Sequence, residues 1–368
     1  MNKHLQKFGI GLILIICLIL NACSNSEDRP EPLTPTQVEQ RYSSGVVLIQ
    51  TSYCYSISFN NGPTFYFTGI SSDGKLENLT MDEEEIKPVT AYGTGFFIGK
   101  DGLIATNSHV ISPTVDIATA RQQIVDAFHS LAAQWSKEIN EITENLGVIK
   151  MAIIECDSYS DQYELQAAYN ELEEERNERQ EAVNAIHALG GMNYEATLHS
   201  EIGVAYNDSH ITNNSDFHPC VTLKEDEEHD LAIIQLKDKT TPENRHIFRI
   251  PKGRSRDSED YESNEENNGT ENSMKLYMIG FNLGPTLALT NNGLKAQITS
   301  GELSQDTDDA HLMYSIPALH GSSGSPVINQ YGKLIAVNFA GLDQAQSFNY
   351  GIKISYLSKL LSKVKNKE

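Results

Sequence analysis

The sequence has few cysteines and few basic residues for its length. Only five cysteines occur in 368 residues, with no Cys-x-x-Cys pair and no histidines nearby at metal-ligand spacing. This pattern excludes a disulfide scaffold, and we expect no structural metal and no cofactor. Lysine and arginine total 28 against 50 aspartates and glutamates, a formal net charge of −22. Such a surface repels phosphate backbones, so we expect no nucleic-acid partner.

The only long apolar run lies at the N-terminus, from Phe8 to Leu20, after Lys3 and Lys7. A basic start and a short apolar stretch predict a secretory signal over residues 1–22. Its end, Leu-Asn-Ala-Cys, resembles the lipobox of bacterial lipoproteins, which implies lipid on Cys23 and attachment to a membrane. An uncleaved N-terminal anchor is the alternative. Either way we expect the chain in the bacterial cell envelope, periplasmic or surface-exposed, with residues 23–36 as a tether.

Short strands dominate the body of the chain, residues 37–368. Runs such as Ser44 to Thr51 and Leu103 to Thr106 are rich in β-branched and apolar residues and are bounded by turn signals. Helices do not alternate with strands in βαβ fashion. We expect one strand-rich unit from residues 37–112 and 192–252, and a second, with a C-terminal helix, from residues 274–368.

Residues 113–191 have a helical period instead. Apolar residues recur at threes, fours and sevens, and the run ends at Gly190 and Gly191. The pattern predicts an antiparallel hairpin of two helices, each about 40–50 Å long, interrupted near Gly147 and over residues 151–160. It is either a solvated insertion or a lid, docking arm or oligomerisation element. Residues 253–273 are acidic and almost without apolar side chains, which predicts a disordered loop.

Three chemical signals stand in order along the chain. His109 follows the strand that ends at Thr106, Asp230 precedes the apolar run Leu231 to Leu236, and Ser323 lies in a turn rich in glycine and serine. An imidazole is a suitable base for a serine hydroxyl that attacks a carbonyl, and a carboxylate on its other nitrogen fixes the tautomer. A turn of small residues can also point backbone N–H groups at the oxyanion that forms.

Four blocks around these residues resemble the trypsin-like (chymotrypsin-fold) serine peptidases, nearest to the bacterial branch that includes the HtrA/Deg proteases. They are Gly93-Thr94-Gly95-Phe96-Phe97-Ile98, Ala105-Thr106-Asn107-Ser108-His109-Val110, Asp230-Leu231-Ala232-Ile233-Ile234 and Gly321-Ser322-Ser323-Gly324-Ser325-Pro326. The resemblance implies an all-β fold of two antiparallel six-stranded β-barrels, here with an inserted long α-helical hairpin. No PDZ-like region is expected after Leu360.

The resemblance also assigns roles by position. His109 would be the general base, Asp230 its orienting acid and Ser323 the nucleophile, with the N–H groups of Gly321 and Ser323 forming the oxyanion hole. Two positions depart from the family pattern. Ser322 stands where Asn or Asp is usual, and Ser325 where Gly is usual, so Ser325 is an alternative nucleophile.

The same alignment implies a pocket for the substrate side chain, with no carboxylate at its floor and a preference for a small or medium apolar residue. Its residues would be Pro317, Ala318, Leu319, Asn338, Phe339 and Ala340. We therefore expect a lipid-anchored, extracytoplasmic serine endopeptidase that cleaves proteins or peptides. The alternative is a catalytically silent trypsin-fold binding protein that engages a partner through the hairpin. The sequence leaves the oligomeric state open.

Overall fold

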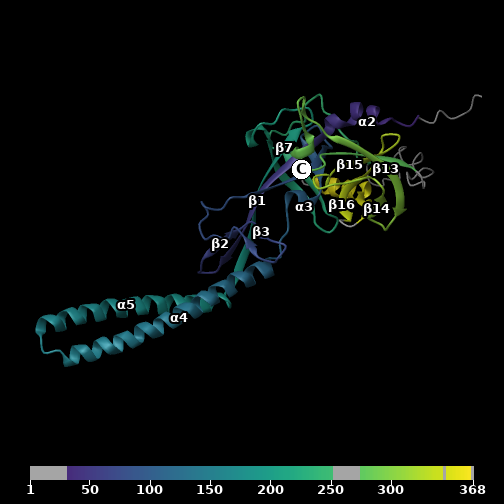
Figure 1. Cartoon of the computed structure of the whole chain (residues 1–368). Helices are drawn as coiled ribbons and strands as arrows, with labels where there is room; N and C mark the ends of the chain where they lie inside the picture. Colours follow the sequence, from purple (N-terminus) through teal and green to yellow (C-terminus); the bar gives the residue numbers. More distant parts are fainter. Residues whose placement is uncertain (1–30, 252–273, 343–344, 366–368) are drawn as a thin grey trace, which may run out of the picture.

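The computed structural model describes residues 31–251, 274–342 and 345–365, without the side chains of residues 306, 340–348 and 365. The predicted signal, Cys23, most of the tether and the acidic loop 253–273 lie outside the described residues. Within the described part, no helix is long and apolar enough to cross a membrane. Figure 1 shows two strand-rich bodies side by side, and a pair of long helices that projects away from them.

The first body is a ring of six antiparallel strands, closed because β1 pairs with β7. β2 (Thr64–Phe67) adds to the outer part of β1, and β3 (Gly69–Ile70) pairs with β4 (Leu76–Glu77). The ring runs through β1 (Val46–Phe59), β5 (Val89–Phe97), β6 (Leu103–Thr106), β9 (Leu231–Leu236), β8 (His218–Asp226) and β7 (Tyr194–Tyr206).

The second body is a closed six-stranded antiparallel barrel. Between its first two strands lie helix α6 (Pro285–Ala288) and the small pair β11 (Leu289–Thr290) and β12 (Gly293–Leu294). The barrel runs through β10 (Lys275–Gly280), β13 (Gln297–Asp306), β14 (His311–Tyr314), β17 (Ala345–Lys353), β16 (Leu334–Leu342) and β15 (Pro326–Asn329). The fold predicted from the sequence, two six-stranded antiparallel barrels with a helical insertion, is confirmed.

One apolar cluster joins the two barrels. It contains Leu48 and Phe96 of the first barrel and Tyr277 and Ile279 of the second, all at most 1% exposed. Helix α2 (Pro35–Tyr42), the 3₁₀ turn Ser43–Gly45 and α7 (Ile354–Lys365) flank the barrels. Leu357 of α7 is fully buried in the same cluster, so the C-terminal helix closes this core. Burial on this scale makes the two barrels a single rigid support for a site between them.

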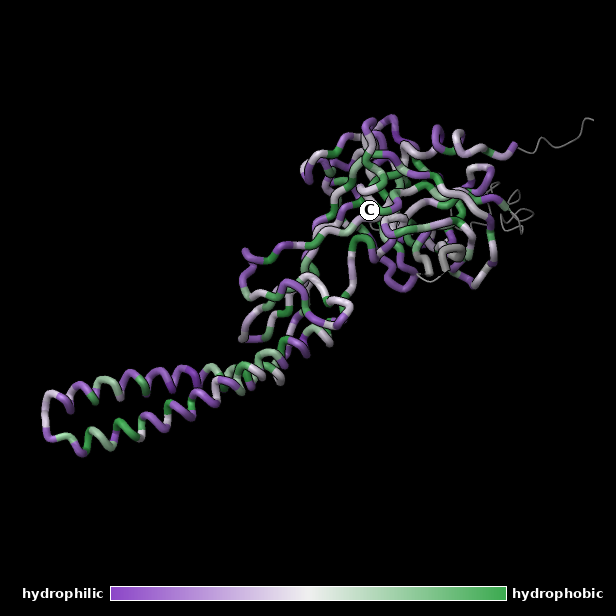
Figure 2. Tube along the Cα trace, in the orientation of Figure 1, coloured by the Kyte–Doolittle hydropathy of each residue, from purple (hydrophilic) through white to green (hydrophobic). Residues whose placement is uncertain are grey.

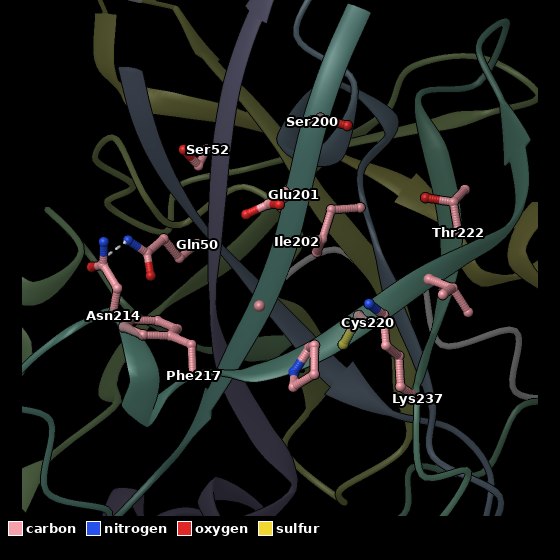
Figure 3. Close-up of a pocket in the computed structure, with 13 residues that line it drawn as sticks. Gln50, Ser52, Ser200, Glu201, Ile202, Asn214, Phe217, Cys220, Thr222 and Lys237 are labelled. Atoms are coloured by element: carbon pink, nitrogen blue, oxygen red, sulfur yellow. Dashed lines mark hydrogen bonds between the residues drawn. The ribbon is translucent and has the colours of Figure 1, made fainter. Parts of the chain in front are cut away.

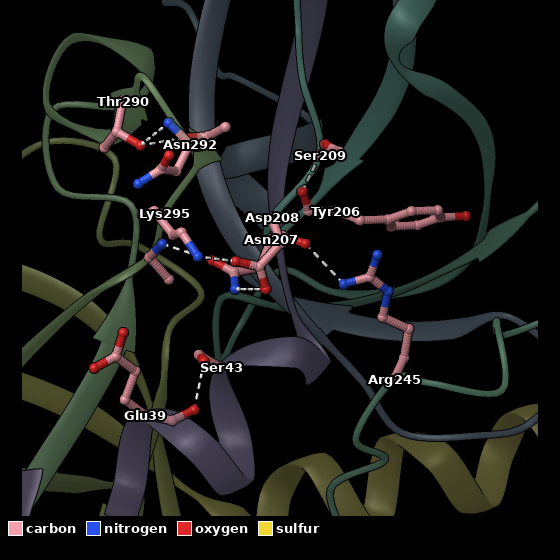
Figure 4. A network of polar contacts seen from close by, with 12 residues as sticks. Glu39, Ser43, Tyr206, Asn207, Asp208, Ser209, Arg245, Thr290, Asn292 and Lys295 are labelled. Carbon is pink, nitrogen blue, oxygen red and sulfur yellow. Dashed lines mark hydrogen bonds and ion pairs between the residues drawn. The ribbon is translucent and has the colours of Figure 1, made fainter. Parts of the chain in front are cut away.

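A polar network joins the barrels at a second place, around the end of β7 (Figure 4). Asn207 accepts a hydrogen bond from the Ala296 backbone at 2.7 Å, and Asp208 pairs with Lys295. The Asp208 backbone N–H donates to Leu294 O at 2.7 Å. Arg245 donates to Asn207 O at 2.7 Å from the first barrel. Because the bonds from Asn207 and Asp208 to residues 294–296 cross between the barrels, they fix the relative orientation of the two halves.

The outer ends of β1 and β7 leave the first barrel as a ribbon that carries the helical hairpin (Figure 1). Aromatic residues of β2, which pairs with this part of β1, pack with Ile124 and Leu189 at the base of the helices; they are Phe65 and Phe67. Strand β7 is continuous through Gly203. The register with β1 is unbroken there, and a Cβ on Gly203 would crowd the Phe217 side chain.

The hairpin consists of α4 (Ile117–Glu155) and α5 (Tyr159–Leu189), with Ser158 as the N-cap of α5. The prediction of a break near Gly147 was wrong, since α4 continues for 39 residues, about 58 Å at the usual rise. Nothing lies within 4 Å of a Cβ built on Gly147. An exposed glycine weakens a helix by about 1 kcal/mol, which the packing of α4 on α5 offsets.

Candidate active site

His109 lies on α3 (Ser108–Ile111), a single helical turn directly after β6, rather than at the end of a strand. Its backbone N–H donates to Asp230 Oδ1 at 2.9 Å, and its ring Nδ1 lies 2.7 Å from Asp230 Oδ2. The imidazole is 45% exposed and the carboxylate 23%. With Nδ1–H held by the carboxylate, the neutral ring presents the Nε2 lone pair to a substrate. The structure therefore brings two of the three predicted catalytic residues together.

Asp230 has its own support. Its φ of +48° lies in the left-handed region, which is uncommon for a residue other than glycine. The fully buried Asn107 donates from Nδ2 to Asp230 O at 2.8 Å, which holds this conformation against the start of α3. Ser108 adds a second tie, donating to Glu225 at 2.9 Å. The β8–β9 loop and α3 are thus locked in one orientation.

The serine turn requires glycine at two positions. Gly321 has φ +91° and Gly324 has φ +86°, both in the left-handed region. A Cβ on Gly321 would crowd Phe281 O, and one on Gly324 would collide with Thr94 O. Side chains at these positions would strain the backbone and separate the turn from the first barrel.

Thr94 of β5 joins the serine turn to the first barrel. Its backbone N–H donates to Ser323 O at 2.8 Å, and its hydroxyl donates to Gly321 O at 2.7 Å. Thr106 in turn donates to Thr94 O at 2.8 Å, three residues before His109. Both threonines are fully buried. The sequence placed Thr94 in a matching block without giving it a role. No local pattern in the sequence marks this role, because the contact joins residues 227 positions apart.

The two serines of the turn differ in accessibility. Ser325 is fully buried, and its hydroxyl has no hydrogen-bond partner among the described residues. A Cβ on Gly280 would collide with that hydroxyl, so β10 covers it. Ser323 is half-buried, and its Oγ donates to Phe339 O at 3.3 Å. A nucleophile must reach its substrate, so the geometry favours Ser323 over Ser325. No hydrogen bond joins Ser323 to His109 in the described part of the chain.

Backbone N–H groups of the turn separate into two kinds. Those of Ser322, Gly324 and Ser325 donate to Leu319, Asn338 and Ser322 carbonyls, respectively. Those of Gly321 and Ser323 have no acceptor among residues that the structure describes. The two groups left available are the pair that the resemblance assigns to an oxyanion hole.

A buried network supports the turn from behind. Asn338 Nδ2 donates to Ser322 O at 3.0 Å and lies 3.3 Å from Ser322 Oγ, while Ser322 Oγ donates to Leu319 O at 2.7 Å. Tyr314 donates to Asn338 Oδ1 at 2.8 Å. Complete burial raises the pKa of Tyr314 well above its usual value, so the phenol stays a donor. Ser322, at a position where the family usually has Asn or Asp, is therefore held by an amide from β16.

The residues predicted to form the substrate pocket have different surroundings. Pro317 is exposed and Leu319 is 49% exposed, whereas Ala318 and Phe339 are half-buried. Asn338 is 1% exposed and its amide is engaged with the turn. The side chain of Ala340 lies outside the described ones. A different hollow, of about 520 Å³, lies on β1, β7 and β8 and contains none of these residues (Figure 3).

One acidic group has the donor types of a metal site. Asp226, Glu228 and His229 place their ligand atoms within 4.8 Å of one another. Asp226 already bonds the His229 ring at 3.1 Å, and the ring packs on Tyr356 at 4.2 Å between centroids. These contacts account for the cluster without a metal, because they attach the loop before β9 to the C-terminal helix.

Comparison with known proteins agrees with this geometry. Residues 185–337 match the family model described as "Trypsin-like peptidase domain". This part of the chain is therefore similar to trypsin-like peptidases. The match includes Asp230 and the serine turn, while His109 precedes it. Among curated proteins no match was found. The serine endoprotease from Yersinia pestis is similar in structure at a TM-score of 0.43 and 12% identity, covering 91% of this chain and 68% of that one.

Proposed function

We propose that the protein is an active serine endopeptidase in which Ser323, His109 and Asp230 form the catalytic triad. The observation that carries the proposal is the pairing of His109 with Asp230 beside a serine turn that Thr94 ties to the same barrel. The family match supports peptidase chemistry, and the available N–H groups of Gly321 and Ser323 support acyl transfer in particular.

In the proposed reaction, Ser323 Oγ rotates away from Phe339 O and attacks the carbonyl carbon of the scissile peptide. His109 Nε2 takes the hydroxyl proton, and Asp230 stabilises the imidazolium that results. The N–H groups of Gly321 and Ser323 bond the oxyanion. When the tetrahedral intermediate collapses, His109 returns the proton to the leaving amine and an acyl-Ser323 ester remains.

Water then completes the cycle. His109 takes a proton from a water molecule, the hydroxide attacks the ester, and the second oxyanion uses the same two N–H groups. Collapse releases the carboxylic acid, and the proton returns to Ser323 Oγ. Each step uses the same three side chains. Asp230 stays ionised throughout, which agrees with its two hydrogen bonds from His109.

We further propose that lipid on Cys23 anchors the enzyme in the bacterial cell envelope, on the periplasmic or outer face. The Leu-Asn-Ala-Cys sequence at the end of the apolar run supports this. We also propose that the residues before the serine turn and along β16 accept a small or medium apolar side chain. A Cys23→Ser variant that stays in the membrane fraction after signal cleavage would refute the anchoring.

Proteolysis tests the activity. The purified chain should cleave unfolded β-casein into fragments, and Ser323→Ala should abolish cleavage while keeping the circular dichroism spectrum. Ser325→Ala is the matched control and should retain activity, because its hydroxyl is buried. Undiminished cleavage by the Ser323→Ala variant would refute the proposal.

A further inference from the structure

The free end of the hairpin exposes apolar side chains that no other part of the described chain covers. The five most exposed large hydrophobic side chains in the described residues all lie here. They are Val148, Met151, Ile154, Tyr159 and Tyr163, between 56% and 86% exposed. Large apolar side chains grouped on a surface mark interaction sites. Figure 2 shows hydrophobic residues of α4 continuing to the hairpin tip.

These side chains are not needed to hold the two helices together. Ile142 and Leu146 of α4, at most 8% exposed, end the buried face between the helices. Val148, Met151 and Ile154 follow at intervals of three, so they lie along one side of the last turns of α4. Their exposure costs free energy in the isolated chain unless something covers them.

Beside this apolar strip lies an acidic hollow of about 680 Å³. Its apolar lining comes from Ala152, Cys156, Leu165 and Ala168, and its carboxylates from Glu155, Asp161 and Glu164. All three carboxylates are exposed, and none forms an ion pair with another described residue. An apolar floor with acidic groups above it suits the alkyl stem and charged end of lysine or arginine.

The middle of the hairpin is arranged differently. There Arg179 pairs with Glu138 and Glu175, and Arg176 lies 3.8 Å from Glu173. From residue 141 to residue 164 the chain has six acidic residues and only Lys150 as a cation. Within residues 141–164, the negative charge is therefore opposed by a single lysine.

The negative charge of the tip indicates which kind of partner could bind there. A second copy of this chain, at −22, would meet the acidic tip with like charge, and anionic lipid would be repelled in the same way. We propose that the hairpin tip is a docking surface for a protein segment that carries lysine or arginine among apolar side chains. Its cation enters the hollow toward Glu155, Asp161 and Glu164, and its apolar residues cover Met151 and Ile154.

Binding of a defined peptide tests the proposal. The probe is a fluorescein-labelled 18-residue amphipathic peptide of lysine and leucine, titrated by fluorescence anisotropy in 150 mM salt. The full chain with Ser323→Ala is used, so that proteolysis cannot consume the probe. The triple variant Glu155→Gln, Asp161→Asn, Glu164→Gln should weaken binding at least tenfold, and so should the double variant Met151→Ser, Ile154→Ser.

The matched control removes three charges elsewhere on α5, with Glu171→Gln, Glu174→Gln and Glu178→Gln, and should change affinity less than twofold. Helix content by circular dichroism should be equal in all variants. Equal weakening by both triple variants, or no binding by the unaltered tip, overturns the proposal. It is also overturned if Met151→Ser, Ile154→Ser abolishes self-association in sedimentation, or binding to phosphatidylcholine vesicles, because the occupant is then a second copy or a membrane.

Discussion

The serine turn and the hairpin tip both contain small groups of polar atoms. Most of those at the turn are buried and hydrogen-bonded, whereas those at the tip are exposed and unpaired among the described residues. At the turn, the buried side chains of Asn338 and Thr94 donate hydrogen bonds to the Ser322 and Gly321 carbonyls. Among the described residues, two N–H groups of the turn are left without an acceptor. At the tip, Glu155 and Glu164 are exposed and unpaired among the described residues, next to exposed Met151. A reaction centre needs groups fixed before the substrate arrives, whereas a docking surface needs groups that a partner completes.

The largest expected effect follows from Asp230→Asn. An amide cannot stabilise the imidazolium and favours the wrong tautomer of His109, so kcat should fall about 10⁴-fold. Steady-state hydrolysis of a peptide substrate measures it. Asp226→Asn is the control, because Asp226 bonds His229 in the same loop at 3.1 Å. Equal losses in both variants would mean that the loop, and not the triad, was disturbed.

A smaller loss is expected from Asn338→Leu. The substitution leaves Ser322 O without its donor, the turn shifts, and kcat should fall roughly 10²-fold with little change in KM. Asn329→Leu supplies the comparison, since Asn329 is also buried in the second barrel but its side chain, among the described residues, bonds within its own hairpin. It should lower stability without this kcat effect. A change in KM alone for Asn338→Leu would place the residue in substrate binding instead.

Two isoleucines of the hairpin distinguish side chains that hold the helices together from side chains that are free to contact a partner. Ile186 is 7% exposed and packs with Ala132 and Ile139, whereas Ile154 is 69% exposed. Ile186→Ala should destabilise the helices by about 2 kcal/mol, and Ile154→Ala by less than about 0.5 kcal/mol. Hydrogen exchange of the α4 and α5 amides reports both. Similar losses would show that the tip is part of the hairpin core.

The smallest effect should come from Arg179→Met. The Arg179 side chain is 32% exposed and pairs with Glu138 and Glu175 in solvent. Partly exposed pairs contribute little, so the hairpin should lose at most about 1 kcal/mol in the same exchange experiment. A loss above that of Ile186→Ala would indicate that ion pairs, rather than apolar contacts, hold the helices together.

Local pattern was enough to predict part of this molecule. The strand alternation and the helical period after Pro113 predicted two strand-rich units and an inserted hairpin, because each is encoded over a few neighbouring residues. The two barrels were expected only from the resemblance of the four blocks around His109, Asp230 and Ser323 to the trypsin-like serine peptidases. Gly147 misled for the same reason: glycine is a local stop signal, yet α4 continues through it to Glu155.

Contacts between distant residues could not be predicted in this way. Thr94 bonds the serine turn across 227 residues, and Asn338 reaches Ser322 across 16, so neither role leaves a local signal. The α3 turn around His109 also depends on Asn107 and Asp230, which are 123 residues apart. The same holds for the exposed tip, because periodicity shows an apolar face but not which part of that face is covered.

Labelling with a fluorophosphonate probe tests the triad most directly. The unaltered protein should gain one adduct by intact mass, mapped to Ser323, and Ser325→Ala should be labelled equally. Ser323→Ala should gain none, and His109→Ala should react at least about 10³-fold more slowly. An adduct on Ser325, or labelling that persists in Ser323→Ala, would contradict the assignment of Ser323 as the nucleophile.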